Sequence, residues 1–280
     1  MDLDLAGKRA LVTGSNSGIG KGIAQVLAGE GCTVAIHGRD HARCEDAVAE
    51  IVAAGGKAVS ATGDLASEAG CAGVAASLHD QLGGIDILVN NAGGRASSHR
   101  NDGVERPENP GWLETPWADW VWTYEQNVGA AVRLIQSYVP GMKERGWGRV
   151  INIASAAATQ TEPDLADYAA AKAAMVNLTS SLAKTLAHTG ITVNTISPGA
   201  VETPSLRRSF TDLAARLGWD SEDWDEIERR MTRELIPIAA DRFGRPEDIG
   251  RMVALLASPL SAYMTGANYR VDGGQCRSIN

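Results

Sequence analysis

Short apolar runs alternate with longer helical patterns from one end of the chain to the other, and this alternation is the feature that most restricts the fold. The runs expected to form strands are residues 9–13, 33–37, 58–61, 85–89, 149–154, 192–197 and 268–271. The stretches expected to form helices are 19–29, 40–54, 68–82, 119–144, 164–188 and 246–257. Strands separated by helices of about ten or more residues are typical of βαβ units with right-handed crossovers. The sequence therefore predicts an α/β fold with a doubly wound, mostly parallel seven-stranded sheet and helices on both faces.

The composition limits the class of protein. We expect one domain over residues 1–280, because single α/β domains reach about 250 residues. The 26 basic against 34 acidic residues give a net charge of −8, which argues against a nucleic-acid partner. No apolar run approaches the roughly 20 residues that span a bilayer, so no membrane is expected. The four cysteines (Cys32, Cys44, Cys71 and Cys276) are scattered, which is typical of reduced thiols in a cytoplasmic protein, and no metal-ligand spacing occurs.

A glycine-rich segment directly follows the first predicted strand. Residues 13–20 read Thr-Gly-Ser-Asn-Ser-Gly-Ile-Gly. Without a Cβ the backbone can turn sharply and approach a pyrophosphate, to which the N-terminus of the next helix offers free N–H groups. Such glycine spacings also occur in ordinary turns, but the position between a strand and a helix favours a Rossmann-type dinucleotide site.

Tyr168 and Lys172 are four residues apart in a predicted helix and therefore share one face. A free tyrosine has a pKa near about 10 and is a poor base at neutral pH. A unit charge about 4 Å away supplies on the order of 4 kcal/mol at an effective dielectric near about 20, enough to lower that pKa by about three units. The alternative is a tyrosine and a lysine on a solvated helix face.

Together these motifs resemble the classical short-chain dehydrogenase/reductase family, and the resemblance covers nearly the whole chain. Other segments occur in the family's order: Asn90-Asn91-Ala92-Gly93, Asn127, Ser155 thirteen residues before Tyr168, Pro198-Gly199, Thr203 and Val271-Asp272-Gly273-Gly274. Residues 242–248, Arg-Phe-Gly-Arg-Pro-Glu-Asp, are similar to relatives in the β-ketoacyl reductase branch.

The resemblance implies a role for each matching residue. Tyr168 would be the general acid in reduction and the base in oxidation, and Lys172 would lower its pKa and bond the nicotinamide ribose. Ser155 would polarise the substrate carbonyl, and Asn127 would hold a water that relays protons past Lys172. Asp64 would contact adenine. The full set implied to bind the cofactor is Gly14, Ser15, Asn16, Ser17, Gly18, Ile19, Gly20, His37, Arg39, Asp64, Leu65, Asn91, Ala92, Gly93, Tyr168, Lys172, Pro198, Gly199, Val201 and Thr203.

The end of the second predicted strand bears on the choice of cofactor. NAD-preferring Rossmann sites usually carry an acidic residue there, which bonds the ribose 2′-hydroxyl. This chain has His37-Gly38-Arg39 instead, and Arg39 can pair with a 2′-phosphate. The sequence therefore favours NADP(H). The alternative is that Arg39 stacks on adenine while NAD(H) is used.

Two long segments interrupt the alternation of strands and helices. Residues 94–118 contain three prolines and follow Gly93, and residues 200–238 lie where the family places its substrate lid. Loops of this length are usually functional or disordered. Six of the seven tryptophans fall in or just after these segments. We therefore expect Arg95, Trp112 and Trp224, with Ser155 and Tyr168, to contact a bulky, partly apolar substrate, although packing is an equal alternative for the tryptophans.

The function predicted from these features is an NADP(H)-dependent oxidoreductase that interconverts a ketone and a secondary alcohol. One alternative is a β-ketoacyl-thioester reductase, and another is a non-catalytic dinucleotide sensor. The presence of Tyr168, Lys172, Ser155 and Asn127 favours the enzyme over the sensor. The resemblance also implies a homotetramer, formed through the helices around Asp119 and Tyr168 and the C-terminal strand.

Overall fold

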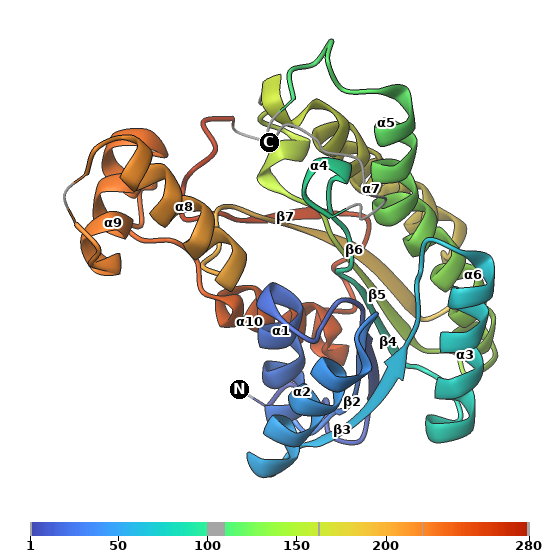
Figure 1. Ribbon diagram of the computed structural model, residues 1–280. Coiled ribbons are helices and arrows are strands. Elements are labelled where there is room, and N and C mark those ends of the chain that lie inside the picture. Colours follow the sequence, from blue (N-terminus) through green and yellow to red (C-terminus); the bar gives the residue numbers. More distant parts are fainter. Residues whose placement is uncertain (1, 100–109, 162, 220, 279–280) are drawn as a thin grey trace.

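The computed structural model of the chain describes residues 2–99, 110–161, 163–219 and 221–278. Seven strands form one sheet in the order β3-β2-β1-β4-β5-β6-β7, and every pairing is parallel (Figure 1). The strands are β1 (Arg9–Val12), β2 (Thr33–Gly38), β3 (Lys57–Thr62), β4 (Ile87–Asn90), β5 (Gly148–Ile153), β6 (Ile191–Pro198) and β7 (Asn268–Val271). The predicted doubly wound sheet is confirmed, and the helices lie on both of its faces.

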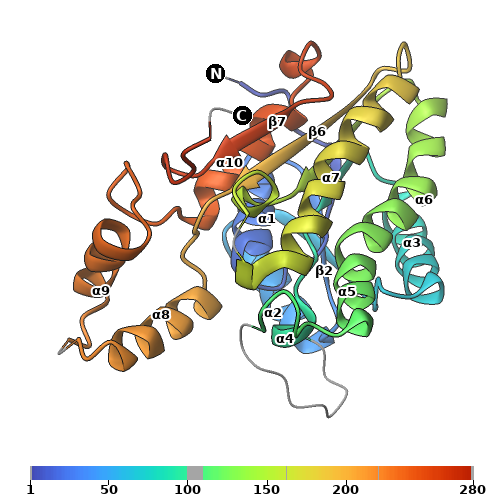
Figure 2. The ribbon, with the colours of Figure 1, turned by 90° about the horizontal axis from the view of Figure 1, so that it is seen from above.

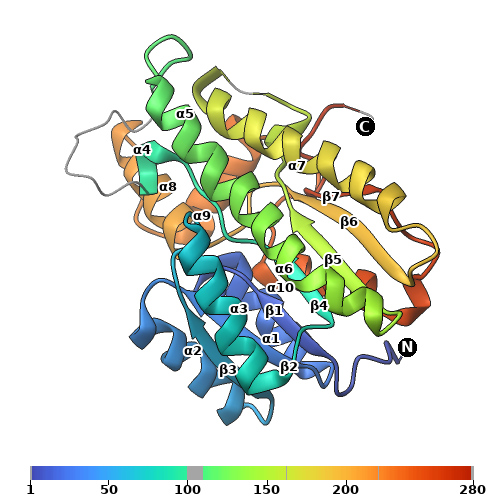
Figure 3. The same ribbon diagram turned by 90° about the vertical axis from the view of Figure 1, so that its right-hand side faces the viewer.

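The two faces of the sheet carry separate apolar cores because successive side chains of a strand point in opposite directions. In β1, Ala10 and Val12 face one core, whereas Leu11 faces the other. Three helices cover the first face: α1 (Gly18–Gly29), α2 (His41–Ala53) and α10 (Pro246–Ala257). Three more cover the second face, as Figure 3 shows: α3 (Glu68–Leu82), α6 (Ala130–Glu144) and α7 (Ala166–Thr185). No helix of the described residues is long and apolar enough to cross a membrane.

The helix predicted over 119–144 begins earlier and contains an irregular turn. It consists of α5 (Trp117–Tyr124), a π-helical turn (Glu125–Gly129) and α6, which follow one another without a break. The segment before it contains the four-residue α4 (Ala96–His99). Residues 100–109 lie outside the described residues, so the predicted insertion at 94–118 is described only at its two ends.

The expectation that 200–238 is irregular is wrong. This stretch, called the lid segment below, contains α8 (Pro204–Arg216), α9 (Trp224–Arg230) and a π-helical turn (Met231–Leu235). Its helices stand away from the sheet (Figures 1 and 2) and bury a small core of their own. The charged residues of these helices lie beside the apolar ones that form this core, which is why the stretch did not look helical in the sequence.

Candidate active site

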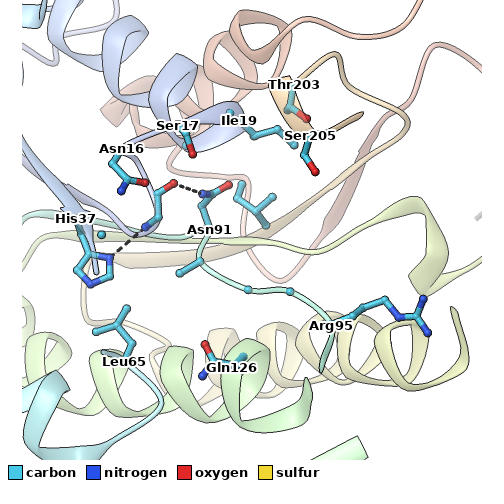
Figure 4. A pocket seen from close by; sticks show the side chains of 18 of the residues that line it. Asn16, Ser17, Ile19, His37, Leu65, Asn91, Arg95, Gln126, Thr203 and Ser205 are labelled. Atoms are coloured by element: carbon cyan, nitrogen blue, oxygen red, sulfur yellow. Dashed lines mark hydrogen bonds between the residues drawn. The ribbon is translucent and has the colours of Figure 1, made fainter. Parts of the chain in front are cut away.

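A cavity of about 930 Å³ opens at the carboxyl ends of the central strands, where ligands bind in doubly wound sheets (Figure 4). Most of the predicted cofactor residues line it: Gly14, Asn16, Ser17, Gly18, Ile19, Gly20, His37, Arg39, Asp64, Leu65, Asn91, Ala92, Gly93, Tyr168, Lys172, Pro198, Gly199 and Thr203. Ser155 and Arg95 line it as well. Residues that the sequence did not single out include Asp40, Arg43, Gln126, Leu165, Ser205 and Arg208.

Two predicted cofactor residues lie behind the cavity wall. The Ser15 hydroxyl donates to the Val12 carbonyl at 2.6 Å and accepts the His37 backbone N–H at 3.0 Å. Val201 is 4 % exposed and forms a β-bridge with Gly244. Both residues hold loops in place with groups that are bonded inside the protein, and their contact with the cofactor stays a prediction.

The glycine-rich segment joins β1 to α1 with almost no space for side chains. A Cβ on Gly20 would lie 2.4 Å from the Gly14 carbonyl oxygen, and one on Gly14 would lie 3.1 Å from the Ala92 Cα. Gly14 and Gly18 also have φ of +63° and +56°. Ser17, the N-cap of α1, makes no side-chain capping bond, so the first-turn N–H groups are not capped by it. These features fit a dinucleotide whose pyrophosphate lies against the start of α1.

The His37 ring is hydrogen-bonded to the backbone of this glycine-rich segment. Its Nδ1 accepts the Gly14 N–H at 3.1 Å, and its Nε2 lies 3.2 Å from the Gly63 carbonyl (Figure 4). An acceptor at Nδ1 and a donor at Nε2 require the neutral imidazole. Burial lowers the pKa of His37 to about 4, so the ring stays neutral near pH 7. His37 therefore borders the cavity while both of its ring nitrogens are engaged by the backbone.

The loop after β4 is fastened to the same glycine-rich segment. The Asn91 side-chain amide donates to the Thr13 carbonyl at 2.8 Å, and the Thr13 hydroxyl accepts the N–H groups of Asn91 and Ala92 at 2.9 and 2.8 Å. Asn90 donates to Asn152 on the neighbouring β5 at 2.8 Å. The Asn90–Gly93 motif thus fixes the distance between the first loop and the centre of the cavity.

Tyr168 and Lys172 lie on α7 beside the inner end of the cavity. The Lys172 ammonium is 5.5 Å from the centre of the Tyr168 ring and donates to the Ile153 carbonyl at 2.9 Å. Burial raises the pKa of the Tyr168 phenol, while its hydrogen bond with Ser155 and the positive charge of Arg95 act to lower it. Burial lowers the pKa of Lys172 to about 7. Ser155 and Arg95 therefore act on the phenol where the sequence predicted Lys172 alone.

Arg95 is a buried cation in the wall of the cavity. Its guanidinium pairs with Asp167 at 3.1 Å, and Asp167 also accepts the Thr123 hydroxyl at 2.7 Å. Thr123 in turn accepts the Ala96 N–H at 3.2 Å. Because Asp167 precedes Tyr168 directly, this chain of bonds fixes the start of α7 against the loop that follows β4.

Asn127 lies in the π-helical turn, a feature that occurs frequently at functional sites. Its Nδ2 donates to the carbonyls of Gly94 and Thr123 at 2.8 and 2.7 Å. Its buried Oδ1 has no partner among the described residues. A Cβ on Gly93 would lie 2.2 Å from this oxygen and 3.3 Å from the Lys172 ammonium. The two groups thus face one small space under Gly93, and the water relay through Asn127 remains a prediction.

The two tryptophans predicted to contact substrate do not line the cavity. Trp224 is 7 % exposed and packs in the core of the lid segment, with its ring centre 6.1 Å from that of Phe243. Trp112 is 60 % exposed and meets Trp120 edge-on at 5.5 Å. Each side chain packs on an aromatic partner outside the cavity lining, and its contact with substrate stays a prediction.

The lysine at the centre of the site gives a testable pH dependence. Between the Lys172 pKa of about 7 in the folded protein and its ordinary value of 10.5, the unfolded chain binds more protons, so the free energy of unfolding rises with pH. Below this window both states are protonated, and above it neither is. We expect Lys172→Met to remove this rise in melts of the cofactor-free protein from about pH 6 to about pH 10. Lys184→Met, at an exposed position on α7, should retain it, and parallel curves for wild type and Lys172→Met would contradict the assignment.

No group of three or more potential metal ligands occurs among the described residues, and their four cysteines are free and buried.

Comparisons with known proteins identify the family. A family model described as enoyl-(acyl carrier protein) reductase matches residues 14–275. The chain is 37 % identical to an uncharacterized oxidoreductase of Bacillus subtilis, with both chains covered fully. It is 35 % identical to a 3-oxoacyl-[acyl-carrier-protein] reductase of Vibrio cholerae, over 97 % of this chain and 98 % of the other. The crystal structure of L-sorbose reductase from Gluconobacter frateurii, in complex with NADPH and L-sorbose, matches with a TM-score of 0.89 and 32 % identity over both whole chains.

The chain belongs to the short-chain dehydrogenase/reductase family of NAD(P)-dependent oxidoreductases, which confirms the resemblance seen in the sequence. The family and the cavity at the carboxyl edge of the sheet together make it an enzyme of ketone and alcohol chemistry.

Proposed function

We propose that the protein reduces a ketone to a secondary alcohol, or performs the reverse oxidation, with NADP(H) as its preferred cofactor. The observation that carries this proposal is the convergence of Ser155, Tyr168 and Lys172 at the inner end of a cavity whose other end is the glycine-rich segment. The bound nicotinamide would supply or accept the hydride. The protein groups would position the carbonyl and move the proton.

Tyr168 would donate its hydroxyl proton to the carbonyl oxygen during reduction and take it back during oxidation. The Ser155 oxygen accepts the Ala157 N–H at 3.2 Å, and its O–H, which bonds the Tyr168 phenol when no substrate is present, would turn to donate to the same carbonyl oxygen. Two donors aimed at one developing oxyanion stabilise the charge that forms there. Lys172 would return the proton to Tyr168, and Asn127, with its unpartnered oxygen, would hold the connecting water.

The preference for NADP(H) rests on the charges around the adenosine end of the cavity. Arg39 and Arg43 both line it. His37 is neutral and occupies the position where NAD-preferring sites carry an acidic residue, which would repel a 2′-phosphate. Asp40 also lines the cavity, but its carboxylate accepts the Arg43 N–H at 3.2 Å as the cap of α2. A 2′-phosphate would therefore meet two arginines, and NAD(H) is the alternative cofactor.

A bulky substrate is supported by a second cavity at the start of α7. This cavity of about 890 Å³ shares Leu165 with the cofactor cavity and is bounded by Ile236, Pro237 and the C-terminal segment 275–278. We assign residues 1–280 to one domain. Within it, the lid segment and the insertion at 94–118 would close over such a ketone. Arg95 would contact its polar end.

A panel of ketones tested with NADPH and NADH checks the proposal, with the absorbance of the reduced nicotinamide as the readout. Turnover of β-ketoacyl thioesters above all simple ketones would favour the alternative that the Vibrio cholerae relative supports. Cofactor binding without turnover of any ketone or alcohol would favour the non-catalytic sensor. Reduction of bulky ketones with NADPH is the expected result.

We further propose a cytoplasmic homotetramer. Trp117, Val121 and Tyr124 are exposed apolar residues on one side of α5, at the spacing of a single helix face. A second copy of the chain would cover them in a symmetric contact. Sedimentation analysis should give a tetramer, and a monomer at micromolar concentration would contradict this assignment.

A further inference from the structure

The lid segment is packed as a unit around its own small core. Trp224, Ile227 and Met231 pack together with Phe243, which follows the lid segment in the chain. The Phe243 ring centre is 5.3 Å from that of Phe210 on α8. The lid segment therefore depends for its placement on the two short stretches that connect it to the sheet.

These two connections are tied to each other. The Gly244 N–H donates to the Ala200 carbonyl at 2.9 Å, and the Glu202 N–H donates to the Gly244 carbonyl at 2.8 Å. They form a parallel β-bridge between Val201 and Gly244. The lid segment thus leaves and rejoins the rest of the protein at one place, beside the residue Arg245.

Arg245 contacts two carboxylates, Glu228 on α9 and Glu202 in the first of the two connections. Its two terminal nitrogens donate to the two carboxylate oxygens of Glu228 on α9, at 2.7 and 3.0 Å. Its Nη1 also lies 2.8 Å from Glu202, next to the cofactor cavity. Burial alone would raise the pKa of Glu228, but the bonds from Arg245 and from the Phe243 N–H hold it below its usual value. Glu228 therefore stays charged near neutral pH.

The backbone of Arg245 is fixed relative to the glycine-rich segment. Its N–H donates to Asp248 at 2.8 Å at the start of α10. Helix α10 packs closely on α1: a Cβ on Gly22 would lie 2.3 Å from the Cβ of Pro246, and one on Gly250 would lie 2.7 Å from a methyl group of Val26. Helix α1 begins at the glycine-rich segment, so Arg245 stands on the same rigid body as the pyrophosphate end of the cavity.

Glu202 connects this cluster to the cavity itself. The next residue, Thr203, lines the cavity and caps α8 by accepting the Leu206 N–H at 3.2 Å. A Cβ on Gly18 would lie 3.4 Å from the Thr203 methyl group. A dinucleotide that contacts Gly18 and Thr203 would therefore restrain the stretch that carries Glu202.

We infer that Arg245 is a positioning residue that couples the lid segment to occupancy of the dinucleotide cavity, by bridging Glu228 on the lid to Glu202 beside the cavity. This inference rests on the proposed function and gives the segment 242–248 a role beyond the family resemblance. Cofactor binding restrains Glu202, Arg245 passes that restraint to α9, and the lid is held over the substrate. The coupling is a difference in lid stability between the free and the cofactor-bound protein.

Hydrogen exchange of the lid amides tests this coupling. We expect NADPH to slow exchange in α8 and α9 of the wild type. Arg245→Gln should lose the slowing in α9 while still binding NADPH, whereas α8, which Thr203 caps directly, should keep it. The variant should also lose at least about 5-fold in kcat/KM for a bulky ketone, the lower end of typical couplings between sites. Arg245→Lys should restore part of both effects, because one ammonium keeps the charge but cannot reproduce the bidentate pair.

Two further variants separate coupling from simple loss of structure. Glu202→Gln weakens the contact of this residue with Arg245 and its 3.4 Å pair with Arg207 on α8, and it leaves the bidentate pair between Arg245 and Glu228. It should therefore reduce the NADPH-dependent slowing in α9 with the lid still folded. Arg233→Gln is the matched control, because Arg233 pairs with Asp241 at the lid's end without reaching the cavity, and it should behave as wild type.

The outcomes distinguish this inference from the proposed function. Full NADPH-dependent slowing of α9 in both Arg245→Gln and Glu202→Gln overturns the coupling. A wild-type lid that gains no protection while NADPH binds overturns it too, but leaves the proposed reaction standing. If neither NADPH nor NADH binds the wild type, the proposed function fails, and the inference fails with it.

Discussion

Tyr168→Phe is expected to reduce turnover by about 10²- to 10⁴-fold, the usual contribution of a general acid–base group, while cofactor affinity stays nearly unchanged. The substitution removes one hydroxyl and keeps the ring. The proton donor is lost, and with it the hydrogen bond between Ser155 and the phenol. The measurement is steady-state reduction of the best ketone from the panel, together with a binding titration of NADPH.

Tyr138→Phe is a matched control for this prediction. Tyr138 is a buried tyrosine of α6, away from the cavity, and its hydroxyl has no partner among the described residues. We expect wild-type turnover in this variant. Most of the activity surviving in Tyr168→Phe, or equal losses in the two variants, would contradict the assignment of Tyr168 as the proton donor.

Arg39→Gln is expected to raise the KM for NADPH by about ten- to a hundredfold and to change the KM for NADH little. A charge-assisted contact is worth about 1.5–3 kcal/mol, and only NADPH offers the 2′-phosphate to make it. Arg43→Gln should act in the same direction, because Arg43 lines the same part of the cavity. The measurement is the ratio of kcat/KM for the two cofactors.

Arg251→Gln controls for the loss of a positive charge, since Arg251 is an exposed residue of α10 that pairs with Asp248. It should leave the cofactor ratio as in the wild type. A wild-type enzyme that already prefers NADH would contradict the NADP(H) proposal. An Arg39→Gln variant that weakens both cofactors equally would show that Arg39 contacts the adenine, which both cofactors share.

The order of strands and helices was predictable because the periodicity of apolar residues is a local property. The site was predictable to a similar extent, since its residues follow strands whose carboxyl ends meet at one edge of the sheet. Ser155, Tyr168 and Lys172 are far apart from Gly14 in the sequence, yet all line one cavity. Knowledge of the topology was sufficient to bring them together.

The side chains that the sequence could not place are those whose direction depends on distant partners. Nothing local indicates that the His37 ring turns toward the backbone of Gly14 and Gly63, or that Trp224 packs against Phe243. The influence of Arg95 on Tyr168 likewise depends on the loop after β4 approaching α7. Residue type alone could name these side chains as candidates, but only packing decides which of them face the cavity.

The strand order also has a consequence for the way the chain folds. Strands β1, β2 and β3 pair across single helical crossovers, so we expect the pairings of this half to form first. By contrast, the other edge of β1 can pair only after β4 has been synthesised. The contact between Arg9 and Asp86, which lies beside this pairing, closes a loop of 77 residues. Pairings between such distant residues slow folding, because chain entropy is lost before the contacts form. The unpaired side of β1 therefore stays open during synthesis, and the cavity, which needs both halves, is among the last parts to be completed.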